Sequence, residues 1–407
     1  MTEPSPRDLR IGIVGFGLRS ILWRDIHRPG RGAIVSAVLD VSERGRADAA
    51  TALPDAVVTG DRDAFIASGL DAAVVLTPDD SHRMAAEPLL DAGIAVFCEK
   101  PLATTLADAD ALLEAAYRGG ARLYVGHNMR HMPVVVLMRR LIQQGAIGDV
   151  RAIWCRHFVG NGGDYYFKDW HADRRRTTGL LLQKGAHDLD VIHWLAGSRT
   201  TRVHAMGALS VYGAVTERRD RTGERMPDWF DLDNWPPLAQ TGLAPIIDVE
   251  DISQMNMVLA SGVLASYQQC HFTPDYWRSY TVIGTEGRLE NVGDESGARV
   301  HVWNRRHGGF AEPDEVHVVP EPPAGALHGG ADRLLVDEFL RFVRQGGMTE
   351  TSPVAARDAV AAAIAATESL RAGGSPRDVP PVRTELAAYF ADGQARPTAA
   401  GAWLRSR

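Results

Sequence analysis

The stretch RIGIVGFGLRS, residues 10–20, decides the fold of this chain. Its first half is a short apolar run, typical of a buried parallel strand. Its second half, Gly15 to Ser20, matches the pattern G-x-G-x-x-(G/A), with serine in the last place. In this pattern the first glycine permits a tight turn, the second lets the backbone approach a pyrophosphate, and the small last residue lets a helix pack on the strand. The stretch therefore predicts a strand, a turn and a helix that bind a dinucleotide.

An acidic residue follows at the distance that such a turn requires. Asp40 ends the next apolar run, AIVSAVLD (33–40), about 20 residues after the turn. A carboxylate there accepts hydrogen bonds from ribose hydroxyls and repels a 2′-phosphate, so we expect NAD, with NADP less favoured. Arg44 weakens this preference, and the alternative is a glycine turn without a ligand. The expected cofactor-binding residues of this region are Gly15, Phe16, Gly17, Leu18, Arg19, Ser20 and Asp40.

The first third of the chain alternates strand-like and helix-like segments. Further strands are expected at 71–78, 94–101 and 121–128, with helical patterns between them. Such alternation predicts a doubly wound parallel sheet, in which ligands bind at the carboxyl ends of the strands. After Gly148 the apolar pattern changes to a period of two. This change predicts a large, mostly antiparallel sheet with one covered face, with strands in 150–160, 251–262, 263–273, 278–291 and 298–304.

The fold class is therefore α/β, in two domains. We expect a Rossmann domain over 1–128, an α+β domain over 129–350, and a C-terminal helix and tail over 351–407 that pack back on the body. Residues 177–197 are interpreted as one helix that Gly197 ends. Residues 214–247, rich in proline, aspartate, arginine and tryptophan, form a long loop that we interpret as a lid or a subunit contact.

Composition narrows the class of protein. The net charge of -7, without a long run of one sign, disfavours nucleic acid and anionic membranes as partners. The sequence shows no signal peptide and no apolar window of about 18 residues, so we expect a cytoplasmic protein. Three cysteines without metal spacing favour reduced thiols and no metal site.

Lysine is scarce in this chain. Among 44 basic residues only three are lysine, namely Lys100, Lys168 and Lys184. An ammonium is a compact point charge whose pKa burial can shift, whereas arginine stays protonated. These three positions therefore become candidates for function, and the alternative is chance survival of lysine in an arginine-rich chain.

Several motifs lie in the order of a known family. They are Thr77-Pro78-Asp79 with His82, then Glu99-Lys100-Pro101, then Lys184, His187, Asp188 and Asp190. In this respect the chain resembles the Gfo/Idh/MocA oxidoreductases, for which E-K-P at the end of a Rossmann strand is the most specific element. The resemblance implies an NAD(P)-dependent enzyme of sugars or inositols, with a second domain for substrate binding and homo-oligomerisation as a dimer or tetramer. It adds Thr77, Pro78, His82, Glu99 and Lys100 to the expected cofactor-binding residues.

The resemblance also implies catalytic residues. Lys100 matches the lysine that contacts the reacting hydroxyl, where an ammonium stabilises a developing alkoxide; the alternative is a structural ion pair with Glu99. His187 matches a helix histidine suited to general base catalysis. Many relatives place an aspartate four residues before this histidine, where this chain has Gln183. We predict that Lys184, His187 and Asp188 share one helix face as a catalytic group. The alternative is a surface pair of Lys184 and Asp188 beside a buried histidine.

Aromatic and charged residues alternate before this helix, over residues 160–176. Rings stack on the C–H faces of sugars, and charged groups bind hydroxyls or an anionic substituent. The alternative is a solvated loop with an aromatic interface cluster. The expected substrate-binding residues are Tyr165, Lys168, Trp170, His171 and Arg174, with Asn128 after the last Rossmann strand and Tyr276 from a second aromatic stretch.

The leading hypothesis is an NAD-dependent oxidoreductase of a secondary hydroxyl or ketone in a sugar, glycoside or cyclitol. One alternative is an NAD-dependent glycosidase that oxidises the sugar transiently, typically at C3, eliminates the aglycone and reduces the ketone again without net NADH. Another is a non-catalytic NAD-binding regulator. The expected partners are a small sugar-like molecule and further copies of this chain.

Overall fold

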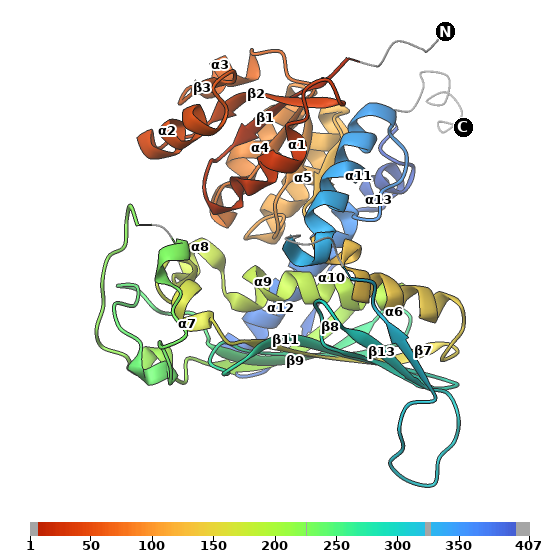
Figure 1. Ribbon diagram of the computed structural model, residues 1–407. Helices are drawn as coiled ribbons and strands as arrows, with labels where there is room; N and C mark the ends of the chain where they lie inside the picture. Colours follow the sequence, from red (N-terminus) through yellow and green to blue (C-terminus); the bar gives the residue numbers. More distant parts are fainter. Residues whose placement is uncertain (1–6, 225, 322–326, 396–407) are drawn as a thin grey trace.

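A computed structural model describes residues 7–224, 226–321 and 327–395, and shows two sheets in two stacked layers (Figure 1). The expectations about the first residues and about the tail from residue 396 onward lie outside the described residues. Within the described residues, no helix is long and apolar enough to cross a membrane.

The first layer is a Rossmann sheet. Its six strands pair in parallel in the order β3-β2-β1-β4-β5-β6, which confirms the doubly wound parallel sheet. Of these six strands β3 was not predicted, because an edge strand of three residues is too short to show a pattern. The strands are β1 (Leu9–Val14), β2 (Ala33–Leu39), β3 (Val57–Thr59), β4 (Ala72–Val75), β5 (Ala95–Cys98) and β6 (Leu123–Val125). The helices between them are α2 (Glu43–Ala52), α3 (Arg62–Ile66), α4 (His82–Asp91) and α5 (Leu106–Gly119).

The helix expected directly after the glycine turn is irregular. A 3-10 helix, η1 (Leu18–Leu22), leads into a short α-helix, α1 (Trp23–Ile26). The Ser20 hydroxyl donates to the Gly17 carbonyl at 2.6 Å, a local hydrogen bond that competes with regular α-helical bonding. A helical segment thus follows the turn, as expected, but it begins as a 3-10 helix.

The second layer is a nine-stranded sheet in the order β14-β13-β12-β11-β7-β10-β9-β8-β15. All its pairs are antiparallel except β7 with β10, so the mostly antiparallel sheet is confirmed. Strands β8, β14 and β15 were not predicted; they lie at or beside the two edges of the sheet, where a strand needs less apolar sequence. The strands are β7 (Val150–Val159), β8 (Thr200–Ala208), β9 (Ile252–Leu259), β10 (Leu264–Cys270), β11 (Tyr276–Gly284), β12 (Arg288–Val292), β13 (Arg299–Trp303), β14 (Glu315–Val318) and β15 (Arg377–Asp378).

Helices fill the space between the two layers, and in the described part of the chain Figure 1 shows none on the opposite face of the large sheet. On the inner face lie α6 (Pro133–Gln143), α9 (Leu180–Gln183), α10 (Gly185–Ala196) and α12 (Pro353–Arg371). The late helix α12 packs on β8, α9 and α10, and also on α5 of the Rossmann layer. It therefore joins the two layers.

A second late helix belongs to the Rossmann core. Phe339 and Phe342 of α11 (Ala331–Gln345) pack with Phe97 and Tyr124 of the parallel sheet. Part of the range 129–350 therefore packs with the first layer. Domain boundaries at residues 128 and 350 stay a prediction.

The single helix expected over 177–197 is broken. It consists of α9 and α10, with Lys184 between them. The break lies where the chain approaches the large sheet, because a Cβ on Gly185 would come within 3.0 Å of the Tyr267 ring. This break, which helical periodicity does not reveal, sets the direction of Lys184.

Candidate active site

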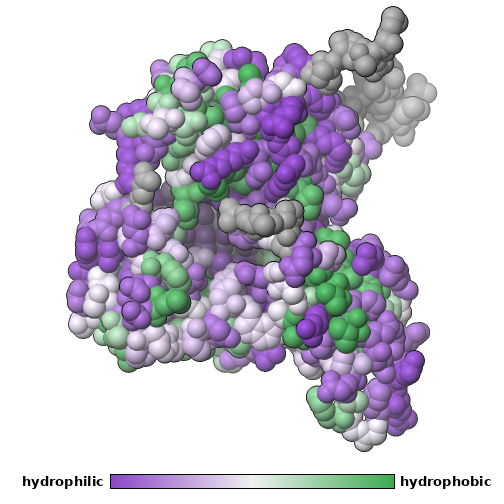
Figure 2. Space-filling model, in the orientation of Figure 1, coloured by the Kyte–Doolittle hydropathy of each residue, from purple (hydrophilic) through white to green (hydrophobic). Residues whose placement is uncertain are grey.

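A cleft of about 1380 Å³ lies between the two layers, and Figure 2 shows the surface hollowed there. It is lined by the carboxyl ends of the Rossmann strands, by residues 161–187 and by part of the segment 214–247. Of the predicted site residues, Gly15, Arg174 and Asp188 do not line it. Those that line it are Phe16, Gly17, Leu18, Arg19, Ser20, Asp40, Thr77, Pro78, His82, Glu99, Lys100, Asn128, Tyr165, Lys168, Trp170, His171, Lys184, His187 and Tyr276.

The glycine turn has the shape that a dinucleotide needs. Gly15 has φ +88°, and a Cβ there would lie 3.1 Å from the backbone of Leu76 and Thr77, so Gly15 forms the turn from below the cleft. Gly17 lines the cleft, and a Cβ on it would meet no atom within 4 Å. The backbone at Gly17 is therefore open to a close-approaching pyrophosphate, which fits a bound NAD(P).

Asp40 is fixed at the end of β2. Its carboxylate accepts hydrogen bonds from the backbone N–H of Phe16 and from the N–H and hydroxyl of Ser42, each at 2.7 Å. Arg44 also lines the cleft and donates to the Gly223 carbonyl of the segment 214–247. This end of the cleft therefore combines a carboxylate suited to ribose hydroxyls with a contact from the long loop.

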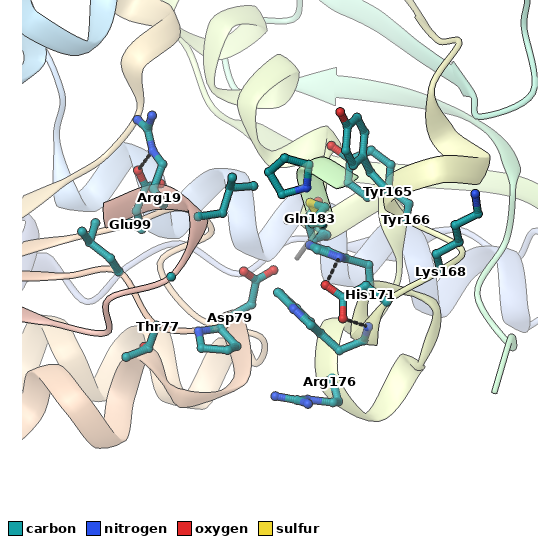
Figure 3. Close-up of a pocket in the computed structure, with 18 of the residues that line it drawn as sticks. Arg19, Thr77, Asp79, Glu99, Tyr165, Tyr166, Lys168, His171, Arg176 and Gln183 are labelled. Carbon is teal, nitrogen blue, oxygen red and sulfur yellow. Dashed lines mark hydrogen bonds and ion pairs between the residues drawn. The ribbon is translucent and has the colours of Figure 1, made fainter. Parts of the chain in front are cut away.

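Arg19 joins the turn to two buried carboxylates, of which Figure 3 shows Glu99 beside it. Its Nε donates to Glu99 at 2.5 Å, and its terminal nitrogens donate to Asp332 of α11 at 2.6 and 2.9 Å. Asn128 donates to the same Asp332 at 2.9 Å. Although burial opposes ionisation of Glu99, Arg19 outweighs it and lowers the pKa of that carboxyl. Arg19, Glu99 and Asn128 thus form a charged support for the site.

His82 connects two loops of the Rossmann layer. Its ring nitrogens lie 3.0 Å from the Thr77 carbonyl and 2.8 Å from the Pro101 carbonyl. Burial lowers the pKa of His82, and the hydrogen bonds to the two carbonyls oppose this. The histidine holds the loop after β4 against the loop that carries Lys100, and its role is to position that loop.

Lys100 and Asp79 face the same part of the cleft from neighbouring strands. The Lys100 ammonium donates to the Gln183 carbonyl at 3.3 Å and has no carboxylate within 4.0 Å among the described residues. Burial lowers the pKa of Lys100, and the Asp79 charge opposes this. Burial raises the pKa of Asp79 to about 7, and its Oδ2 has no hydrogen-bond partner within the described part of the chain. The positive charge of Lys100 therefore favours the ionised form of Asp79, and the negative charge of Asp79 favours the protonated form of Lys100.

His187 projects from α10 toward this pair. Burial, followed by the charge of Lys100, lowers the pKa of His187 well below its usual value. Its Nδ1 is buried without a partner among the described residues, and its ring lies 5.8 Å from the His127 ring. A neutral imidazole in the cleft can accept a proton.

Asp188 faces the opposite way, so the expected shared face of Lys184, His187 and Asp188 was wrong. It accepts hydrogen bonds from Arg278, His157 and Tyr267, each at 3.0 Å, and from the Tyr280 hydroxyl. Successive helix residues point about 100° apart, so His187 faces the cleft while Asp188 faces the large sheet. Asp190 is buried elsewhere, against Arg130 at 2.7 Å.

Aromatic rings form the wall opposite the Rossmann layer (Figure 3). Trp170 and His171 stack with their ring centroids 3.8 Å apart, and Tyr165 stacks on Phe230 of the long loop with an interplanar angle of 7°. Arg174, predicted here, points outward to Asp248 at 3.1 Å. Arg176 takes its place in the cleft wall.

Lys168 fastens the long loop. Its ammonium donates to Asp164 at 2.9 Å and to the Trp229 carbonyl at 3.4 Å. Asn234 donates to the same Asp164 at 2.6 Å. Residues 220–224, 226, 227 and 229 of this loop line the cleft, which is compatible with a lid, although the choice between a lid and a subunit contact stays a prediction.

All three lysines of the chain line this one cleft. Scarcity of lysine was thus a useful signal. Five residues that line the cleft were not predicted as site residues: Asp79, Tyr166, Arg176, and Arg221 and Trp229 of the long loop. Asp79 and Tyr166 lie next to selected residues, whereas Arg221 and Trp229 carry no local signal. No group of three or more metal-binding side chains occurs in the described ranges.

The fold and the site define an NAD(P)-binding oxidoreductase. Two family models match the chain: an oxidoreductase family with an NAD-binding Rossmann fold at residues 9–127, and the GFO/IDH/MocA C-terminal domain at residues 135–290. The chain belongs to the Gfo/Idh/MocA family.

Its relatives are distant. YteT of Bacillus subtilis is 25% identical over 340 residues, which cover 74% of this chain and 78% of that protein. Inositol 2-dehydrogenase 1 of Saccharopolyspora erythraea is 33% identical over 199 residues, 48% of this chain and 56% of that enzyme. A levoglucosan dehydrogenase, solved with NADH and L-sorbose, has a TM-score of 0.74 at 19% identity, over 92% of this chain and 100% of that one, which shows a common fold.

Proposed function

We propose that this protein is an NAD-dependent oxidoreductase of a secondary hydroxyl or ketone in a sugar, glycoside or cyclitol. The observation that carries the proposal is the meeting of the Lys100 ammonium and the neutral His187 imidazole in one cleft, beside the glycine turn. The names of two relatives, an inositol 2-dehydrogenase and a levoglucosan dehydrogenase, support this class of substrate.

In the proposed reaction each residue has a separate task. Lys100 donates a hydrogen bond to the reacting oxygen and stabilises the negative charge that develops on it. His187 accepts the hydroxyl proton, because its imidazole is neutral and Gln183 cannot act as an acid or base. The stacked Trp170 and His171 offer a ring face to the sugar. When bound, NAD supplies the hydride-accepting ring.

A substrate screen tests the proposal. Free sugars, cyclitols, sugar acids and aryl glycosides are offered with NAD, while NADH absorbance and product release are followed together. Net NADH with a sugar or cyclitol supports the proposal. Aglycone release without net NADH would indicate the glycosidase, and NAD binding without turnover of any compound would indicate the regulator.

Asp40 should determine the choice of cofactor. We expect Asp40→Ala to lower the preference for NAD over NADP by about tenfold, because a charged partner of the ribose hydroxyls is lost. Asp40→Asn is the matched control, since it can keep the hydrogen bond from the Phe16 N–H while removing the charge. Calorimetric Kd values for both cofactors measure the effect. Tighter binding of NADP than NAD by the unmodified protein would contradict the assignment.

The bare face of the large sheet is the proposed contact between copies of this chain. Trp154, Met206, Val258 and Leu264 are exposed on the adjacent strands β7, β8, β9 and β10, where Val258 and Leu264 are direct cross-strand neighbours, and among the described residues Figure 1 shows no helix on that face of the sheet. We expect Trp154→Glu to weaken the oligomer by at least about 100-fold, because it buries an unpaired charge. Leu334→Glu, at an exposed apolar residue of α11, is the control. Light scattering after size-exclusion chromatography measures the mass of the oligomer. An unchanged mass for Trp154→Glu would exclude this face as the contact between copies.

A further inference from the structure

The cleft contains two ammonium groups that form no direct ion pair with a carboxylate of the described residues, although the more distant Asp79 still acts on Lys100. Among the described residues, neither Lys100 nor Lys184 has a carboxylate oxygen within 4.0 Å, whereas Lys168 is paired with Asp164 at 2.9 Å. Both side chains are only partly exposed, and they line the cleft. A desolvated charge without a counter-ion is costly, so protein ammonium groups in such places normally find a partner.

Lys184 differs from the paired Lys168 also in its surroundings, which are two aromatic rings. Its Nζ lies 5.3 Å from the ring centroid of Tyr166 and 5.6 Å from that of Tyr276. Burial disfavours its charge, but the two phenols outweigh burial and raise the pKa of Lys184, so it stays protonated at neutral pH. Two other cations lie nearby: Lys100, whose pKa the charge of Lys184 lowers, and Arg278, whose guanidinium is paired with Asp188 at 3.0 Å on the sheet side.

Further hydrogen-bond donors converge on the same point. The Tyr276 hydroxyl accepts a hydrogen bond from Arg278 at 2.7 Å, which leaves its own proton for another acceptor. Tyr166 lines the cleft on the other side of the ammonium. One ammonium between two phenols provides a site for a single negative charge with two acceptor oxygens.

We propose, on the basis of the oxidoreductase function above, that the substrate is an acidic sugar or cyclitol whose carboxylate binds Lys184 between Tyr166 and Tyr276. Lys100 donates to the carbonyl of Gln183, the residue before Lys184. The bound carboxylate therefore lies close to the reacting hydroxyl. In this arrangement Lys184 binds substrate, and the proton passes to His187.

Matched pairs of substrates test the proposal. The ratio of kcat/KM for an acid to that for its neutral parent is measured with NAD for glucuronate and glucose and for galacturonate and galactose, with glucose 6-phosphate as a phosphate probe. We expect the unmodified protein to prefer the acid at least about tenfold, and Lys184→Met to lower this ratio about tenfold. Lys184→Arg should keep part of the preference, because it keeps the charge.

Arg176→Met is the matched control, because it removes a cation from the same cleft that is already paired with Asp80 at 2.9 Å. An equal loss of preference in Lys184→Met and Arg176→Met would show that the acid is attracted by the positive charge of the cleft as a whole, and would overturn the Lys184 site. A preference for neutral sugars, or for the phosphate over both carboxylates, would also overturn the proposal while leaving the oxidoreductase function in place.

Failure of the oxidoreductase function can be distinguished from failure of the carboxylate site. If no compound is oxidised, calorimetry of glucuronate and galacturonate with the NAD-loaded protein replaces kinetics. Binding that Lys184→Met abolishes while NAD affinity is retained supports the carboxylate site, even if the proposed reaction is wrong. Absence of binding of both acids overturns the carboxylate site.

Discussion

Lys100→Ala is expected to lower kcat by at least about 100-fold while changing the affinity for NAD far less. The ammonium stands at the end of β5, where burial lowers its pKa and the neutral His187 faces it. Its stabilising effect is realised when negative charge develops on the substrate oxygen, so the loss falls on kcat. The glycine turn and Asp40, which carry the expected cofactor contacts, are unaffected by the substitution.

Steady-state kinetics and NAD calorimetry on the same samples check this expectation. Lys168→Ala is the comparison, because it removes another cleft lysine whose ammonium is held by Asp164 and the lid. A small change in kcat for Lys100→Ala would show that Lys100 is only a structural charge. An equally large loss for Lys168→Ala would show that lid closure, and not charge stabilisation, limits turnover.

The fold could be predicted because its main signals are local. Residues 10–20 and Asp40 define a dinucleotide turn by spacing alone, and period-two patterns found the central strands of the large sheet. The missed strands β3, β8, β14 and β15 lie at or beside sheet edges and are short or mostly exposed. Edge strands bury less surface, so their sequences carry less of the apolar pattern.

The candidate site could be predicted only in part. Motifs found Lys100, His187 and the turn, because each is fixed by its own strand or helix. The direction of Asp188 depends on Arg278 and Tyr280 from β11, about 90 residues later in the chain. The placement of Arg176 in the cleft and Arg174 outside it depends on a single short helix, α8 (Arg174–Thr177). Such choices are made by tertiary contacts, and neither periodicity nor composition records them.

The buried carboxylate of Asp79 lowers the stability of the folded protein at neutral pH. Its carboxyl is buried at the end of β4, and burial raises its pKa to about 7. The corresponding value in an unfolded chain is about 3.9, so between these pH values the folded protein binds more protons than the unfolded chain. Stability from this group is therefore highest at acid pH and falls as the pH rises from about 4 to 7. The charge is kept because it supports the ammonium of Lys100.

Asp79→Asn is therefore expected to stabilise the ligand-free protein at pH 8 by about 2–4 kcal/mol, with a gain that shrinks as the pH falls toward 4. The same variant should lose about tenfold in kcat at neutral pH, because Lys100 loses the charge that raises its pKa. Melting temperatures across this pH range, together with kcat, measure both effects. Asp80→Asn, at the exposed neighbour paired with Arg176, should show neither. If Asp79→Asn instead destabilises the protein at pH 8, the favourable interactions of the Asp79 carboxylate outweigh its cost of burial, and the expectation is wrong.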